Sequence, residues 1–292
     1  MKIDFHEPST VTPLYVGGDR PRVATMSGVA LIDAHRLVAT HLAGMRMYLV
    51  RFDLESGTHE IVDTLPTTWH GKKQYTDLVS FDGRDRFATS NCEANGFSTY
   101  RLDGDHLRHE RDYPILGAGF CHGATFVPGT NLLAASCTSN GRNVYFVDLE
   151  SGKTIYQFSG GAWQPKDACF IDERRMAVIY QNGRATPGRG RAYDSKIELI
   201  EFDCAWRWHA LLHALPSLAS CNADQVVYSD GKLYVSNQTQ HKIAVLSMTD
   251  GRLALDSEIE IYGFDFPHGV SVRDGLLAVS CYGDSTVRVA RL

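Results

Sequence analysis

The feature that most constrains this chain is a unit that recurs six times. Each unit starts with a short apolar strand, as in HGATF or HGVSV, and a second strand ends in small polar residues, as in LLAASCT or LYVSNQT. A third, alternating strand follows, as in NVYFVDL, and several copies add a fourth, as in KTIYQF. Because an internal repeat fixes the architecture of a chain, all six units are expected to belong to one array.

The spacing of the units predicts the kind of array. One anchor residue stands just before or at the start of each first strand, and successive anchors lie 50, 45, 45, 57 and 44 residues apart. Four short antiparallel strands with their turns need about that length. Four-stranded units repeated radially make a β-propeller, so we predict an all-β, six-bladed propeller over residues 1–292 as a single domain. The anchors are Ser27, Asp77, His122, Asp167, Asp224 and His268.

Two segments test this prediction. The sixth unit ends after its third strand, TVRVARL, which would leave an open sheet edge. We expect an N-terminal strand, either KIDF or TPLYV, to complete that blade and close the ring. Segment 204–215, CAWRWHALLHAL, fits either a short helix with His209 and His213 on one face or the fourth strand of blade four. The strand is favoured, so its HxxxH spacing is not read as a metal site.

Composition excludes several function classes. The chain has 43% hydrophobic residues, and its 29 basic and 34 acidic residues give a net charge of −5, which disfavours nucleic acid as a partner. No apolar run reaches the roughly 20 residues that span a bilayer, and the start, MKIDFHEPST, lacks a secretory pattern. A soluble, cytoplasmic protein without a membrane partner is predicted. Seven cysteines without a CxxC pair argue against a disulfide scaffold or zinc knuckle.

Propeller geometry predicts where the polar residues meet. First strands line the central channel, and the connections into the first strand and out of the second open on one face. The anchors and the residues that end the second strands are therefore expected to point into one shared pocket. This second ring is His41, Asn91, Cys137, Tyr180, Asn237 and Cys281.

The residue types in this pocket suggest chemistry. Blades two and five both combine Asp with Asn, and blades three and six both combine His with Cys, so opposite blades match. Three carboxylates and two imidazoles in one channel are costly without a cation, a substrate or coupled protonation. One solution is a divalent metal, either calcium, magnesium or manganese on oxygen ligands, or manganese, iron or zinc if imidazole takes part. The other is metal-free proton transfer by a histidine that an aspartate orients.

Roles follow from these positions. We predict the catalytic set His122, His268, Asp167, Tyr180 and His41, and the metal set Asp77, Asn91, Asp224 and Asn237. Insertion 183–195 in blade four is predicted to form a lid, although a solvated loop is the simpler alternative. Polar channel residues also commonly bond only water, strand-end cysteines commonly only pack, and the "HG" steps fit turn chemistry. The predicted substrate-binding residues are Ser27, Trp69, Trp163, Arg184, Arg189, Arg191, Cys137 and Cys281.

The segments HGATFVPGTNLLAASCTSNGRNVYFVDLESGKTI and HGVSVRDGLLAVSCYGDSTVRVARL resemble repeats of a broad superfamily of six-bladed propellers. It includes gluconolactonases and senescence-marker-type lactonases, strictosidine-synthase-like proteins, and YVTN and NHL repeat proteins. The resemblance to the lactonases implies one divalent cation held by a Glu, an Asp and Asn side chains. By blade position, Asp77, Asn91, Asp224 and Asn237 match that site, whereas no Glu stands in either ring and two histidines are added.

Two functions remain open at this point. The first is an enzyme at the channel mouth that acts on a small polar or anionic molecule by lactone or ester hydrolysis, isomerisation, elimination or cyclisation, without an organic cofactor. The second is a non-catalytic propeller that binds a protein partner or ligand. An exposed apolar patch around Trp69 and Trp163, with no bound ion, would favour the second.

Overall fold

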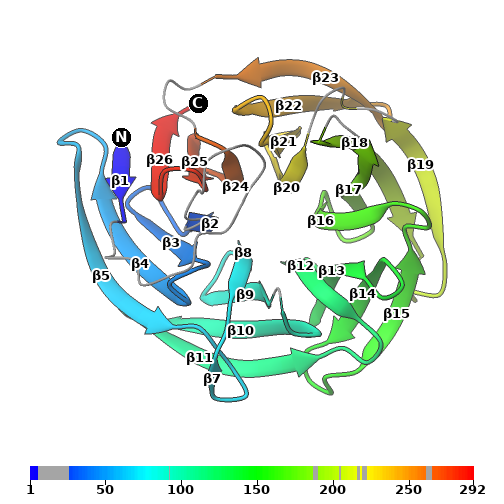
Figure 1. Cartoon of the computed structure of the whole chain (residues 1–292), viewed down its shortest axis with the longest axis horizontal. Helices are drawn as coiled ribbons and strands as arrows, with labels where there is room; N and C mark the ends of the chain where they lie inside the picture. The colour runs from blue at the N-terminus through cyan, green and yellow to red at the C-terminus, as the bar shows by residue number, and fades with distance from the viewer. Residues whose placement is uncertain are drawn as a thin grey trace.

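Six four-stranded antiparallel sheets radiate around a central axis in the computed structural model (Figure 1). The structure describes residues 1–5, 26–91, 93–186, 190–203, 205–215, 218, 222–260 and 265–292, without the side chains of 183–193. Within these ranges all regular elements are strands, which confirms the predicted six-bladed, all-β propeller. In the same ranges, nothing helical is long and apolar enough to cross a bilayer.

Each blade has four strands, whose numbers rise from the channel outwards. The exception is blade six, whose outermost strand is β1. Blade one is β2 (Met26–Leu31), β3 (Arg36–His41), β4 (Arg46–Asp53) and β5 (Thr58–Pro66). Blade two is β8 (Thr76–Phe81), β9 (Arg86–Asn91), β10 (Gly96–Asp103) and β11 (His106–Pro114). Blade three is β12 (Gly119–Phe126), β13 (Leu132–Ser139), β14 (Asn143–Asp148) and β15 (Thr154–Ser159).

The other three blades repeat this order. Blade four is β16 (Gln164–Phe170), β17 (Arg175–Thr186), β18 (Gly190–Phe202) and β19 (His209–Leu215). Blade five is β20 (Ala223–Ser229), β21 (Lys232–Asn237), β22 (Lys242–Thr249) and β23 (Arg252–Ile259). Blade six is β24 (Pro267–Arg273), β25 (Leu276–Cys281), β26 (Thr286–Arg291) and β1 (Lys2–Asp4), and a small hairpin of β6 (Thr68–Trp69) and β7 (Lys72–Lys73) joins blades one and two.

The ring closes as the truncated sixth unit predicted. β1 pairs antiparallel with β26, with Lys2 opposite Arg288 and Asp4 opposite Thr286. KIDF is therefore the closing segment, whereas TPLYV lies outside the described residues. The favoured strand in segment 204–215 is also confirmed, because β19 pairs with β18 as the outer strand of blade four.

Apolar side chains fill the spaces between neighbouring blades. The cluster between blades six and one joins Ile3, Val29, Tyr48 and Val289, and equivalent clusters combine strands of other adjacent blades. Each fully buried Val, Leu, Ile or Phe stabilises the fold by about 1.5–3 kcal/mol. The core is thus a ring of inter-blade layers, and the axis is left to the polar anchors.

A β-bulge lies at the start of the innermost strand of every blade. The pairing of the innermost strand with its neighbour shifts register across the anchor in five blades, for example between Cys121 and Gly123 and between Pro267 and Val270. In blade four the shift lies between Pro165 and Asp167, so Lys166 is the inserted residue and the predicted anchor Asp167 pairs with Ile179. A bulge inserts one extra residue and redirects its side chain. The inserted residues therefore share one level of the channel although the strands around them alternate normally.

The glycine after an anchor is required by space. A Cβ on Gly123 would collide with the Asp167 carboxylate and lie 2.9 Å from the Lys166 carbonyl oxygen. A Cβ on Gly269 would lie 2.8 Å from the Ser27 carbonyl oxygen. Neither glycine has a positive φ, so close approach of the next blade, rather than the turn chemistry considered above, accounts for the "HG" steps.

Hydroxyl groups near the ends of the second strands link the blades. Thr40 Oγ1 donates to the Asp77 carbonyl oxygen at 2.6 Å, and Ser280 Oγ donates to the Ser27 carbonyl oxygen at 2.8 Å. Ser280 Oγ also accepts from Gly269 N at 2.8 Å. These two small polar residues thus hold the inner strand of blade one to that of blade two, and the inner strand of blade six to that of blade one.

Candidate functional site

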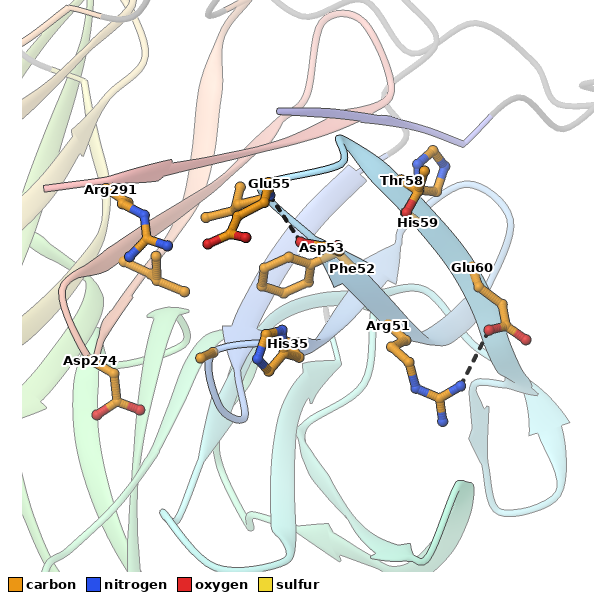
Figure 2. Close-up of a pocket in the computed structure, with 13 residues that line it drawn as sticks. His35, Arg51, Phe52, Asp53, Glu55, Thr58, His59, Glu60, Asp274 and Arg291 are labelled. Carbon is orange, nitrogen blue, oxygen red and sulfur yellow. Dashed lines mark hydrogen bonds and ion pairs between the residues drawn. The ribbon is translucent and has the colours of Figure 1, made fainter.

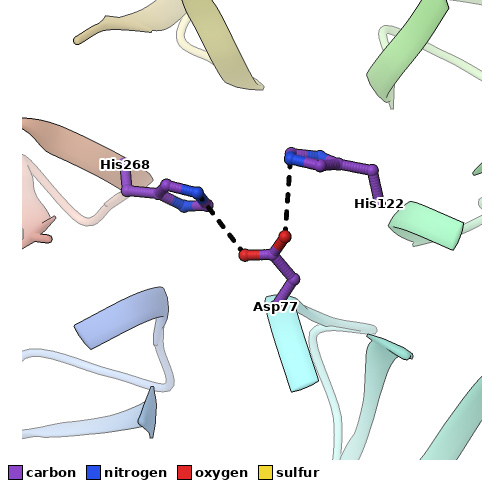
Figure 3. A group of neighbouring side chains, drawn as sticks. All are labelled: Asp77, His122 and His268. Carbon is purple, nitrogen blue, oxygen red and sulfur yellow. Dashed lines mark ion pairs between the residues drawn. The ribbon is translucent and has the colours of Figure 1, made fainter. Parts of the chain in front are cut away.

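Four anchors meet on the axis of the propeller. His122 Nε2 lies 3.4 Å from Asp77 Oδ2 and 3.3 Å from Asp224 Oδ1. His268 Nε2 lies 3.5 Å from Asp77 Oδ1 and 2.5 Å from Asp224 Oδ2. Figure 3 shows Asp77 between the two imidazoles, and all four residues are only 2–5% exposed. We call these four residues the axial cluster.

The far nitrogen of each imidazole is bound to backbone. His122 Nδ1 lies 3.1 Å from the Lys166 carbonyl oxygen, and His268 Nδ1 lies 2.9 Å from the Ser27 carbonyl oxygen. A carbonyl only accepts, so the hydrogen bond requires a proton on Nδ1. A neutral imidazole would then direct the lone pair of Nε2 at a carboxylate. The axial cluster therefore needs a cation at its centre, either a proton on Nε2 or a metal ion.

Charge in the cluster is unevenly distributed. Burial alone would lower the pKa of His268, but the carboxylates of Asp224 and Asp77 outweigh it and raise that pKa to about 9. Burial opposes ionisation of Asp224 as well, yet the nearby side chains of His268, His122 and Lys166 hold the pKa of its carboxyl well below the usual value. In the absence of a metal, the ion pair of His268 with Asp224 is the charged centre of the channel.

Three residues near the cluster were not found by sequence reasoning. Lys166 Nζ lies 3.7 Å from Asp224 Oδ1, and Gln238 Nε2 donates to Asp224 Oδ2 at 2.9 Å. The Tyr282 ring stacks on His268 with a 4.6 Å centroid separation and an angle of 13° between the planes. The signal for Lys166 was the alignment of the repeats, because QPKDACF matched to FCHGATF puts Lys166 at the position of His122. Gln238 and Tyr282 each follow a second-ring residue.

The other two anchors serve the backbone. Asp167 Oδ2 accepts from Val226 N at 3.2 Å, which links blades four and five. Its burial, with the charges of Asp224 and Asp77, raises the pKa of the Asp167 carboxyl well above the usual value. Ser27 Oγ donates to the Asp77 carbonyl oxygen at 3.0 Å. Asp167 also lines a cavity of about 250 Å³ in the channel, whose other walls come from all six inner strands.

The second ring does not share the pocket of the anchors, which corrects the expectation for several predicted residues. Its members pair with the residue before the anchor, as Cys137 does with Cys121 and Cys281 with Pro267. Because the bulge follows that pair, the second ring faces the opposite side of the sheet from the anchor. Cys137, Cys281 and Tyr180 accordingly lie in apolar clusters between blades.

The remaining second-ring residues bond locally. Asn91 Nδ2 donates to Ser98 Oγ at 2.9 Å, Asn237 Nδ2 donates to Gln240 Oε1 at 2.9 Å, and His41 Nδ1 accepts from Gly44 N at 2.7 Å. Of the predicted metal ligands, the structure thus brings only the two aspartates together. Among the described residues, the group with metal-compatible spacing is Asp77, His122 and His268.

The structure describes some of the predicted substrate-binding residues that lie outside the two rings. Trp69 lies in the β6–β7 hairpin and is half-buried, with its ring edge-on to His70 at 4.9 Å. Trp163 is half-buried beneath Lys196 Nζ, 5.3 Å from the ring centroid. The insertion extends the β17–β18 ladder to Thr186 and Gly190. Its predicted arginines, Arg184, Arg189 and Arg191, have side chains outside the described part, so the lid stays a prediction.

A larger cavity lies away from the axial cluster. Figure 2 shows this groove, of about 650 Å³, beside β4 and β5 of blade one and near Asp274 and Arg291 of blade six. Its polar groups largely bond one another: Arg51 pairs with Glu60 at 3.2 Å, and Asp53 accepts from Glu55 N at 2.9 Å. None of the residues that line it was singled out from the sequence, and no catalytic arrangement is formed there by the residues described.

Comparisons with known proteins support the fold. No family model matches the chain, and no curated protein matches its sequence. A PQQ-bound aldose sugar dehydrogenase from Streptomyces coelicolor is similar with a TM-score of 0.63 and 12% identity, over 96% of this chain and 97% of that one. A proposed 6-phosphogluconolactonase from Bacteroides uniformis is similar with a TM-score of 0.62 and 14% identity, over 90% of this chain and 80% of that one.

A propeller of WD40 repeats is similar to about the same degree. The WD40 repeats of RRP9 give a TM-score of 0.61 with 11% identity, over 94% of this chain and 96% of that one. At such identities the likeness concerns the fold, which hosts both enzymes and scaffolds. The chain is a six-bladed β-propeller whose axis carries two imidazoles and two carboxylates.

Proposed function

We propose that this propeller is an enzyme whose axial cluster holds one divalent metal ion and acts on a small anionic ester or lactone. The observation that carries the proposal is the convergence of two Nε2 atoms on two carboxylates, with both Nδ1 atoms committed to backbone carbonyls. Two neutral imidazoles, two carboxylates and a divalent ion sum to zero charge. A divalent ion can therefore replace two protons on the Nε2 atoms without a change in net charge, and it gives both carboxylates a cation to pair with.

The donor set favours some metals over others. Oxygen-only sites suit calcium and magnesium, whereas a site with two imidazole nitrogens suits manganese, iron or zinc. His122, His268, Asp77 and Asp224 would hold the ion. When bound, it would supply Lewis-acid polarisation of a carbonyl or activation of water.

The surrounding residues support an anionic substrate. Lys166 has a side chain 16% exposed, with its ammonium 3.7 Å from Asp224. Its ammonium group is in a position to pair with a carboxylate or phosphate of a substrate that approaches the cluster. Tyr282 stacks on His268, and Phe120, with a ring 6.4 Å from that of His122, is 41% exposed. These two rings restrict the approach and keep the imidazoles in orientation.

The direct test is elemental analysis of the purified full chain by mass spectrometry. Wild type, His122→Ala and Asp224→Asn are each measured before and after treatment with chelator and re-addition of zinc, manganese or iron. We expect about one metal per chain in wild type and a loss of at least tenfold in occupancy in both variants. His59→Ala, at an exposed position outside the cluster, should keep the wild-type content.

Activity is measured on the metal-loaded chain with a panel of anionic and neutral esters and lactones. Faster hydrolysis of the anionic members, lost in Lys166→Met without loss of metal, would support the proposed substrate class. Metal without any hydrolysis would overturn the reaction but keep the site. A chain that takes up no metal under any condition and hydrolyses nothing would refute the proposal and favour the binding scaffold.

A further inference from the structure

A pair of cysteines lies across two strands of blade three, behind the axial cluster. Cys121 of β12 and Cys137 of β13 are directly opposite in the antiparallel register. Their Sγ atoms are in contact at 2.6 Å, and both residues are fully buried. Directly opposed residues in such a pair have Cα atoms about 4.5–5.5 Å apart, which falls within the about 4.4–6.8 Å that a disulfide spans. The strands therefore hold the two sulfurs at a bridging position without any backbone movement.

The surroundings leave the two thiols to each other. They belong to an apolar cluster that includes Phe97, Tyr113 and Tyr145. Among the residues that the structure describes, no third metal ligand is grouped with them, and two thiols alone do not form a zinc site. A buried apolar pocket accommodates a neutral disulfide more readily than a thiolate.

We propose that Cys121 and Cys137 are a modification site, at which a small-molecule disulfide such as oxidised glutathione converts two thiols into an intramolecular disulfide. One thiolate attacks the oxidant, whose S–S bond breaks with release of one thiol and formation of a mixed disulfide. The second protein thiolate then displaces the other thiol and forms the Cys121–Cys137 bond. Two protein thiols are oxidised, and one external disulfide is reduced to two thiols.

The position of the bond gives it a local consequence. Cys121 immediately precedes His122, and the bulge that aims His122 at the axis begins after the Cys121–Cys137 pair. A covalent bond at this pair would hold β12 to β13 immediately on the N-terminal side of the bulge in β12. This inference does not depend on a metal or on hydrolysis, because the cysteines face the inter-blade core and not the channel.

The test uses the full chain, reduced and then incubated with oxidised glutathione at pH 8. A second sample is refolded from urea in the same oxidant, so that burial cannot block access. Both samples are quenched with N-ethylmaleimide under denaturing conditions and analysed by intact mass and peptide mapping. We expect two fewer alkylated thiols than in the reduced chain, and a cross-linked peptide that contains Cys121 and Cys137.

Variants separate this pair from the other cysteines. Cys121→Ser and Cys137→Ser should each abolish the cross-linked peptide, whereas Cys169→Ser, at another buried cysteine, should leave it intact. The oxidised wild type should also unfold at a higher urea concentration than the reduced chain, and Cys137→Ser should lose this shift. Full alkylation of both cysteines in the refolded sample, or a disulfide with a different partner, would overturn the proposal.

Discussion

The ion pair of His268 and Asp224 gives the metal-free protein a definite pH dependence. His268 has a usual pKa of 6.5, which the folded protein raises to about 9. A raised histidine pKa means that the folded state binds the proton more tightly than the unfolded state. The stabilisation is complete below about pH 6.5 and is lost as the pH rises through about 9. At about 1.36 kcal/mol for each pKa unit, this stabilisation amounts to about 3 kcal/mol.

Urea denaturation in chelator at pH 6, 7.5 and 9 measures this contribution. His268→Gln removes the titrating group, so the difference in unfolding free energy between wild type and variant should shrink by about 3 kcal/mol between pH 6 and pH 9. His59→Gln, at an exposed position, should follow the wild-type curve. A difference between wild type and His268→Gln that is constant across this range would refute the assignment of the ion pair.

Three further predictions concern the joints between blades. Gly123→Ala drives a Cβ into the Asp167 carboxylate and should lower the free energy of unfolding by about 1–3 kcal/mol in urea titrations; an unchanged midpoint would contradict the packing reason given for the "HG" step. Ser280→Ala deprives Gly269 N of its acceptor and should cost about 1–3 kcal/mol, measured in the same way. Deletion of residues 1–5 removes the buried side chains of Ile3 and Phe5 and should cost about 3–6 kcal/mol, with a matching fall in thermal midpoint; a stability equal to that of the full chain would show that β1 does not close the ring.

The fold was accessible from sequence because the repeat, the strand period and the missing last strand all depend on local pattern. Five of the six inserted residues could be located without coordinates, since they stand at a constant place in the unit. In blade four the prediction fell one residue late, on Asp167 instead of Lys166. Six first strands converge on one axis, so six anchors necessarily approach one another. The N-terminal closing strand was also predictable, because the sixth unit ends after its third strand, TVRVARL, and would otherwise leave an unpaired sheet edge.

Which side chains face the channel was less predictable, because the apolar and polar alternation of a strand sequence does not reveal a β-bulge. Without it, Cys137 and Cys281 would share a side with the anchors, and the pocket would hold twelve polar groups. With it, the anchor becomes an inserted residue and the following alternation is reversed. Lys166 was missed because the bulge of blade four lies one residue before the predicted anchor Asp167. Tyr282 was missed because it follows a strand end, where side-chain direction depends on backbone detail.

The pairing of β1 with β26 also sets an order of events during synthesis. About 280 residues separate the two strands, and ribosomes add about 5–20 residues per second, so β1 waits roughly 14 to 56 s for its partner. Blades one to five can assemble during that interval, but the inter-blade layer that contains Ile3 and Val289 cannot. Until β26 emerges, the nascent chain is an open arc with an exposed apolar sheet face at each end. A chaperone that binds apolar surface would have most surface to bind during this period.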